Sequence, residues 1–171
     1  LKIAAMHGDT SIGRIALPLA ASAHAVGAIP DLPPSPQLSE TPLVSVVIPT
    51  KLRIDLLEKC LTSLIARTDY PAFEVIVVDN GASDPSFRSV IAAAAEKLKV
   101  SVVEDHGVFN FSRLINAGAK RARGDLLLIL NDDIEATQRD WMRRMVVSAV
   151  QQDVGAVGAR LLYPDGSIQH A

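Results

Sequence analysis

"GDLLLILNDDIEA", residues 124–136, joins a run of five apolar residues to a cluster of polar and acidic ones. Asn131, Asp132 and Asp133 follow the run directly, although like charges repel and the burial of a carboxylate is costly. A parallel sheet gives a reason for this order, because ligands bind beyond the carboxyl ends of its strands. The stretch therefore predicts a buried strand that ends in a ligand-binding site.

The same alternation of apolar strand and amphipathic helix extends through residues 43–171. We predict strands over 43–49, 73–80, 100–105, 125–130 and 154–163, and helices over 54–68, 85–99, 111–123 and 139–152. Asp84 is the expected N-cap of the second helix, and Gly124 the expected C-cap of the third. Continuous apolar strands separated by helices predict an α/β fold, with a mostly parallel sheet and helices on both faces.

Polar residues stand at the ends of the first four predicted strands. The four groups are Pro49–Thr50, Asp79–Asn80, Glu104–Asp105 and Asn131–Asp133. In a parallel sheet these ends lie at one edge, where a divalent cation can be shared between the acids and a ligand. Because neither a P-loop nor a glycine-rich dinucleotide motif is present, we expect Mn²⁺ or Mg²⁺ to hold the phosphates of the ligand.

Residues 29–42 contain five prolines with polar spacers, which is typical of an extended linker. We therefore assign residues 1–42 to an N-terminal extension and linker, and residues 43–171 to the folded domain. Residues 11–30 share features with a secretory signal, but Pro18 interrupts the apolar stretch, and we expect the tail of an upstream region instead.

The composition excludes several other classes of protein. A net charge of -2 gives no reason to expect a nucleic-acid partner, and the apolar runs are too short for a membrane span. The single cysteine, Cys60, excludes an internal disulfide and a cysteine-based zinc site, and its helical spacing predicts a buried thiol. We expect a cytoplasmic protein, with any membrane association supplied by its full-length context.

Three stretches resemble family 2 glycosyltransferases with the GT-A fold, in particular bacterial enzymes that build surface polysaccharides. They are "LVSVVIPTKLRIDLLEKCLTSLIARTDYPAFEVIVVDNGASD" (43–84), "FNFSRLINAGAKRARGDLLLILNDDIEATQRDWMRRMV" (109–146) and "VGAVGARLLYPDGSIQHA" (154–171). The resemblance implies a truncated, Rossmann-like GT-A fold. It also implies transfer of a sugar, with inversion and a divalent metal, from a UDP-, GDP- or dTDP-sugar to a saccharide or lipid-linked acceptor.

The resemblance also assigns roles to residues at the strand ends. Pro49 and Thr50 would line the nucleoside pocket, and Asp79 would bind the base, with Asp84 closing the pattern that begins at Asp79. Residues 131–133 fall on the DXD motif of the family. Asp133 would be the main metal ligand beside Asn131, and Asp132 would face the ribose or the diphosphate. Asn116 completes the predicted nucleotide-sugar site.

The chain departs from the family pattern in three ways. Asn131 is neutral where the motif begins with an acid, so the metal receives less compensating charge. Ile115 stands where many relatives carry an arginine, which leaves Arg113 as a candidate substitute. The catalytic base of the family would lie beyond Ala171, so we expect this chain to hold mainly the donor-binding half of an enzyme.

Other functions stay open at this stage. One alternative is a non-catalytic module that binds a nucleotide or a nucleotide sugar, which is consistent with finding no candidate for the catalytic base. A sugar nucleotidyltransferase would need a glycine-rich basic loop, which "PTKLRIDLLE" (49–58) does not provide. A phosphoacceptor domain would need a lysine on a late strand, where only Arg160 is found. Single residues also have plainer interpretations: Asp133 or Thr137 as a helix cap, and Glu135, His106 or His170 as surface groups.

Overall fold

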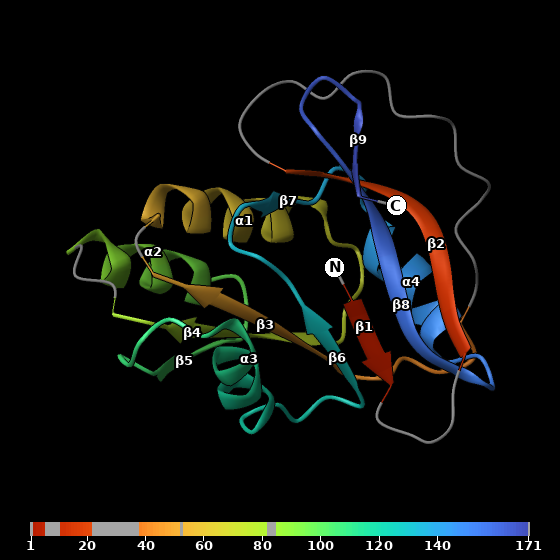
Figure 1. Cartoon of the computed structure of the whole chain (residues 1–171), viewed down its shortest axis with the longest axis horizontal. Coiled ribbons are helices and arrows are strands. Elements are labelled where there is room, and N and C mark those ends of the chain that lie inside the picture. The colour runs from red at the N-terminus through yellow and green to blue at the C-terminus, as the bar shows by residue number, and fades with distance from the viewer. Residues whose placement is uncertain (1, 6–10, 22–37, 52, 82–84, 171) are drawn as a thin grey trace.

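The computed structural model describes residues 2–5, 11–21, 38–51, 53–81 and 85–170, with side chains for 38–51, 53–81 and 85–169 (Figure 1). Most of the predicted linker and the predicted cap Asp84 lie outside the described residues. The strands are β1 (Lys2–Ala5), β2 (Ser11–Ala21), β3 (Val44–Thr50), β4 (Phe73–Asp79), β5 (Val100–Glu104), β6 (Leu126–Ile129), β7 (Ile134–Glu135), β8 (Val154–Leu162) and β9 (Ile168–His170). The helices are α1 (Ile54–Arg67), α2 (Ser86–Ala95), α3 (Phe111–Ala119) and α4 (Trp141–Ala149).

The strands form one sheet in the order β5-β4-β3-β6-β1-β8-β2-β7, and β9 pairs with β8. Neighbouring strands from β5 to β6 are parallel. β1 runs antiparallel to both of its neighbours, β6 and β8, and β2 runs parallel to β8. The predicted α/β architecture with a mostly parallel sheet is confirmed.

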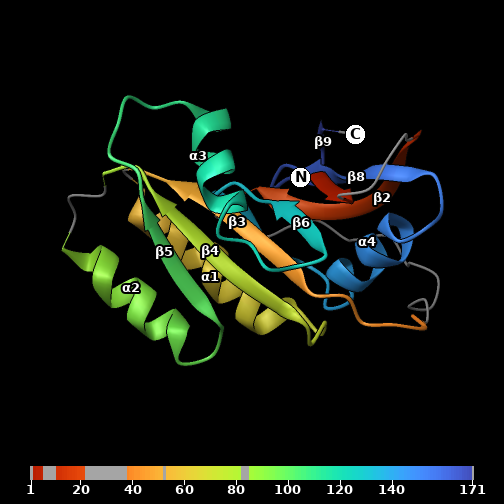
Figure 2. The ribbon, with the colours of Figure 1, turned by 90° about the horizontal axis from the view of Figure 1, so that it is seen from below.

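The helices cover both faces of the sheet, as predicted. Figure 2 shows α3 on one face and α1, α2 and α4 on the other. The larger part of the core lies on the face of α1, α2 and α4, and a smaller cluster lies under α3. α3 packs very closely, since a Cβ atom added to Gly118 would come within 2.4 Å of Val47 on β3. This close packing fixes the last turn of α3 against β3 and β4.

The buried face of α1 leaves out Ile65, an apolar residue next to it on the helix. Leu57, Cys60, Leu61 and Leu64 are buried, but Ile65 is 38% exposed. Ile65 follows Leu64 by one position, a rotation of about 100° around the helix, and this rotation turns it from the sheet towards solvent. Ser63 is buried instead, with a role described below.

The third helix ends earlier than predicted, and Gly124 is not its C-cap. α3 ends at Ala119, with Lys120 at the C-cap position. The following segment turns back to the start of the sheet, where the Arg123 and Gly124 amides donate to the Ser45 hydroxyl, the latter over 2.8 Å. A Cβ on Gly124 would lie 2.6 Å from the Leu43 carbonyl oxygen. Glycine is required there by close approach of two backbones.

The fourth helix begins at Trp141, with Asp140 at the N-cap position, so neither Asp133 nor Thr137 caps it. The chain between β6 and α4 contains a turn at residues 132–133 and the short strand β7, which local periodicity did not indicate. Another unpredicted strand, β9, follows the "YPDGS" turn (163–167), in which Gly166 has a φ of +84°.

The N-terminal region contributes backbone to the sheet. β1 lies between β6 and β8, and β2 lies between β8 and β7. The sequence had left open whether this region packs against the rest of the chain, and the strand pairing places these two segments in the same sheet. The boundary at residue 43 stays a prediction. Among the described residues, no helix has the length and apolar character needed to cross a membrane.

Candidate donor site

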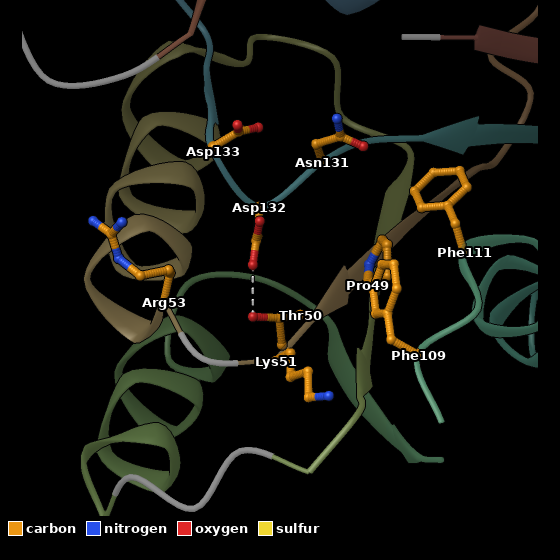
Figure 3. Close-up of a pocket in the computed structure, with 9 residues that line it drawn as sticks. All are labelled: Pro49, Thr50, Lys51, Arg53, Phe109, Phe111, Asn131, Asp132 and Asp133. Atoms are coloured by element: carbon orange, nitrogen blue, oxygen red, sulfur yellow. Dashed lines mark hydrogen bonds between the residues drawn. The ribbon is translucent and has the colours of Figure 1, made fainter. Parts of the chain in front are cut away.

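A pocket of about 350 Å³ opens where β3 and β6 end (Figure 3). One group of lining residues is polar or charged: Thr50, Lys51, Arg53, Asn131, Asp132 and Asp133. The other group is apolar: Pro49, Phe109 and Phe111. Five of the predicted site residues therefore line one pocket, namely Pro49, Thr50, Asn131, Asp132 and Asp133.

The parallel pairing of β3 with β6 creates this site. The pairing aligns Val47 with Ile129, so that the segments that leave the two strands emerge side by side. The Thr50 hydroxyl then donates a hydrogen bond of 2.8 Å to Asp132 Oδ2, across 82 positions of sequence. Thr50 is itself buried. The bond fixes one carboxylate of the acidic turn against the end of β3.

Asp132 carries an electrostatic cost in this position. Burial raises the pKa of its carboxyl group above the ordinary 3.8, and the nearby charge of Asp133 raises it further, although the bond from Thr50 opposes the change. A raised pKa means that the folded chain disfavours the charged form. A bound cation would remove this cost, because it compensates the carboxylate charge directly.

Asp133 has an unused acceptor atom. Its Oδ1 is buried and receives no hydrogen bond from any described residue. In Figure 3 the Asp132 carboxylate points to Thr50, whereas the side chains of Asn131 and Asp133 point to the other side of the turn. The described residues contain no group of three or more His, Cys, Asp or Glu side chains arranged to hold a metal. The turn therefore offers a partial set of oxygen ligands.

Asp79 lies at the end of β4, next to Thr50 in the strand register, and is 6% exposed. Its Oδ1 accepts the Gly81 amide over 2.9 Å, and its Oδ2 lies 3.7 Å from Nε2 of His106. Asp79 does not line the pocket that the described residues form. It neighbours the pocket through Thr50, and its proposed role in base binding stays a prediction.

Asn116 and Arg113 lie on α3, and neither lines the pocket within the described part of the chain. Asn116 is exposed. Arg113 pairs with Asp105 over 2.9 Å, and its Nη2 donates to the Val108 carbonyl oxygen over 2.8 Å. Arg113 therefore holds the loop before α3. Because its guanidinium is engaged there and not in the pocket, this placement counts against Arg113 as a substitute for the arginine that relatives carry at the position of Ile115.

That loop presents the two phenylalanines of the pocket. Phe109 is 54% exposed and Phe111 42% exposed. Besides Arg113, Asn80 secures the loop, since its Nδ2 donates to the carbonyl oxygens of Asp105 and Gly107 over 2.6 and 2.9 Å. Two exposed rings held by polar anchors form a fixed apolar wall. Neither ring was predicted from the sequence, although "FNF" (109–111) before a helix was a visible signal.

Lys51 and Arg53 were also missed. They lie between the end of β3 and the start of α1, on the polar side of the pocket. Arg53 pairs with Asp55 over 2.8 Å and is 62% exposed. The pocket thus combines two acids, two cationic groups and one apolar wall.

Comparisons with known proteins identify relatives of the chain. Residues 45–169 match the sequence profile of the family described as Glycosyl transferase family 2. An uncharacterized protein, y4gI of Sinorhizobium fredii, is 42% identical over 132 residues, which are 77% of this chain and 14% of that protein. The O-antigen biosynthesis protein RfbC of Myxococcus xanthus is 41% identical over 131 residues, which are 77% of this chain and 10% of that protein.

A solved structure agrees with these relatives. The mannosyltransferase PcManGT of Pyrobaculum calidifontis, in complex with GDP-Man and Mn²⁺, superimposes with a TM-score of 0.60 and 27% sequence identity. The match covers 66% of this chain and 34% of that protein. The chain thus spans only a small part of the length of the curated relatives above.

Proposed function

The chain belongs to glycosyl transferase family 2, and on that premise we propose that it binds a nucleotide-sugar donor together with Mn²⁺ or Mg²⁺. The observation that carries the proposal is the hydrogen bond between Thr50 and Asp132, which brings the ends of β3 and β6 into one pocket. The mannosyltransferase complex with GDP-Man and Mn²⁺ supports it, because that protein shares the fold.

The metal would be held by the acidic turn. Asp133 has an unpartnered buried oxygen, and Asp132 has a carboxylate whose charge is disfavoured. Asn131 adds an amide oxygen in the same pocket. Carboxylate and amide oxygens suit Mg²⁺ and Mn²⁺, and these ions commonly complete their coordination with phosphate oxygens and water. When bound, the ion would stabilise the diphosphate as it leaves the sugar.

The two sides of the pocket fit two parts of one ligand. The side with Asp132 and Asp133 fits a metal-bound diphosphate, and Lys51 and Arg53 add positive charge near it. The wall of Pro49, Phe109 and Phe111 fits a flat ring, and the nucleobase is the flat ring of a nucleotide sugar. Asp79, beside Thr50, would accept an N–H from the edge of that base.

We assign residues 43–171 to the donor-binding part of an inverting transferase that acts in polysaccharide biosynthesis, with a saccharide or lipid-linked acceptor. An inverting transfer needs a base that deprotonates the acceptor hydroxyl, and we assign that role to none of the pocket residues. A non-catalytic donor-binding module is the second candidate. It is favoured by the incomplete metal-ligand set of the described residues.

Thermal unfolding of the chain with UDP, GDP, dTDP and CDP, each with and without Mn²⁺, tests the proposal. We expect one nucleotide to stabilise the chain only with metal, by about 2.7 kcal/mol at a hundredfold excess over Kd. Asp133→Ala should abolish this gain. Glu58→Gln, which removes an exposed carboxylate on α1, is the matched control and should leave it unchanged. A folded chain that no nucleotide stabilises would contradict the proposal.

A further inference from the structure

The acidic turn returns to α1 after it leaves β6. The Ala136 amide donates a buried hydrogen bond of 2.9 Å to the Ser63 hydroxyl, at the end of the turn. At the start of the turn, the Cys60 thiol contacts the Asn131 carbonyl oxygen at 3.8 Å. Ser63 also donates to the Cys60 carbonyl oxygen over 2.8 Å. One short segment of α1 therefore contacts both ends of the turn.

Ser63 is well suited to this contact. It is 9% exposed, in a helix face that is otherwise apolar. A buried hydroxyl is costly unless it is hydrogen-bonded, and here it accepts from one backbone and donates to another. The bond to Ala136 also satisfies an amide that would be unpaired in the core. The Ser63 hydroxyl therefore joins the helix to the turn.

Cys60 contributes a weaker contact. The side chain is fully buried, and its thiol lies 3.8 Å from the Asn131 carbonyl oxygen, to which an S–H group donates only a weak hydrogen bond. Cys60 therefore contacts the start of the turn, whereas Ser63 binds its end.

The two attachment points enclose the carboxylates. Asp132 and Asp133 lie between Asn131 and Ala136 along the chain, and the side chain of Ile134 is buried. Thr50 holds Asp132 from the side of β3. The backbone of the turn is thus fixed at its start and end by α1, while Asp132 and Asp133 line the pocket.

We propose that Ser63, assisted by Cys60, positions the Asn131–Ala136 turn so that its oxygens can bind the metal of the donor. Ser63 and Cys60 are positioning residues, since neither lines the pocket among the described residues. The inference rests on the proposed function. Its physical basis is that metal ligands work only when they are held to within about 0.5 Å of their productive geometry.

The experiment compares three variants of the 171-residue chain with the unmodified chain. Ser63→Ala removes the hydroxyl, and Ser63→Thr keeps it. Tyr70→Phe is the matched control, because it deletes a hydrogen bond of another buried side chain, the partly buried bond of 2.7 Å from the Tyr70 hydroxyl to the Pro42 carbonyl oxygen, away from the turn. Each variant is measured well below its own Tm, so that all are folded.

Two quantities are measured. The first is hydrogen exchange of the Ala136 amide without ligand, and the second is the Kd for the Mn²⁺-dependent nucleotide. We expect Ser63→Ala to speed the exchange at Ala136 and to weaken metal-dependent binding about tenfold, the lower end of the effect of residues that orient metal ligands. Ser63→Thr should restore both values. Tyr70→Phe should leave both within about twofold, since its lost bond is remote.

The outcomes separate this inference from the proposed function. Metal-dependent binding that is equally strong in the unmodified chain and in Ser63→Ala overturns the positioning role alone, even if exchange is faster. Equal losses of affinity in Ser63→Ala and Tyr70→Phe overturn it too, because they indicate a general loss of stability. If the unmodified chain binds no nucleotide with metal, the proposed function fails, and the role of Ser63 in metal binding fails with it.

Discussion

Two carboxylates, buried Glu74 and half-buried Asp132, lie at opposite ends of the parallel part of the sheet, and their surroundings differ. Glu74, at the start of β4, is 4% exposed and accepts hydrogen bonds from Ser45 and from the backbone and side chain of Arg123. Asp132, beyond the end of β6, accepts one from Thr50 and lies beside Asp133. Both are acids in a mostly apolar sheet, yet only Glu74 is surrounded by donors.

The pKa directions express this difference. Burial alone would raise the pKa of Glu74, but the bonds from Arg123 and Ser45 together hold it below the ordinary value. For Asp132, burial raises the pKa, and the single bond from Thr50 does not offset it. Glu74 thus stabilises the fold in its charged form, whereas the charge of Asp132 is not fully compensated by the described residues. The comparison contrasts a structural acid with the acid that we propose to bind a cation.

The largest effect is expected for Glu74, at the start of β4. Glu74→Ala removes the acceptor of the Ser45 hydroxyl and of the Arg123 amide, and should lower the free energy of unfolding by about 2–3 kcal/mol. Urea unfolding measures the loss. Glu74→Gln, which keeps the shape and one acceptor oxygen, should lose less. If Glu74→Ala is as stable as the unmodified chain, the distinction drawn between Glu74 and Asp132 is wrong.

A smaller effect is expected at the apolar wall of the pocket. Phe109→Ala should weaken binding of the metal-dependent nucleotide about tenfold, because stacking of a base on an aromatic ring contributes about 1–3 kcal/mol. Calorimetric titration measures this, with inorganic pyrophosphate and Mn²⁺ as a ligand that has no base. Pyrophosphate affinity should not change. Val108→Ala, next to Phe109 and 90% exposed, is the control. An equal loss of nucleotide affinity in both variants would show that the base does not bind at this wall.

The smallest effect is expected for the change in stability at Asp132, and it is a gain in stability where Glu74→Ala gives a loss. Asp132→Asn keeps an acceptor for Thr50 but removes a disfavoured charge, so it should raise the Tm of the metal-free chain at pH 7 by roughly 1–3 °C, a small value because Asp132 is partly exposed to solvent. Thermal unfolding measures this gain. A lower Tm would show that the charge of Asp132 is already compensated.

The gain should also depend on pH. The folded chain binds a proton at Asp132 more tightly than the unfolded chain does, so the unmodified chain gains relative stability as the pH falls through the raised pKa. The advantage of Asp132→Asn should therefore be full above that pKa and disappear near the ordinary value of 3.8. Saturating Mn²⁺ and nucleotide should reverse the order of stability at pH 7, since only the unmodified chain keeps the full set of carboxylates.

The sequence predicted the four parallel strands, their helices and the acids at the strand ends, with errors of a few residues. These features follow from local periodicity, in which continuous apolar runs mark buried strands and 3.6-residue spacing marks helices. The errors have tertiary causes. α3 ends at Ala119 rather than Arg123 because Glu74 and Ser45 bind the following segment, and β7 exists only through its pairing with β2.

The candidate site likewise contains residues that the sequence predicted and residues that it did not. The placement of Thr50, Asp132 and Asp133 at the mouth of the sheet was visible in the sequence, because each directly follows a predicted strand. The contributions of Phe109 and Ser63 were not predicted. Phe109 reaches the pocket through a loop held by Arg113 and Asn80, and Ser63 reaches the turn from the buried face of α1.

The amino-acid sequence by itself determined the four parallel strands, their helices and the strand ends that carry acids, since these depend on neighbours along the chain. Only the tertiary structure decided which acid is satisfied by donors and which keeps an incompletely compensated charge. Thr50 meets Asp132, and Arg123 meets Glu74, across 82 and 49 positions of sequence. Such contacts depend on the order of strands in the sheet, and periodicity carries no information about that order.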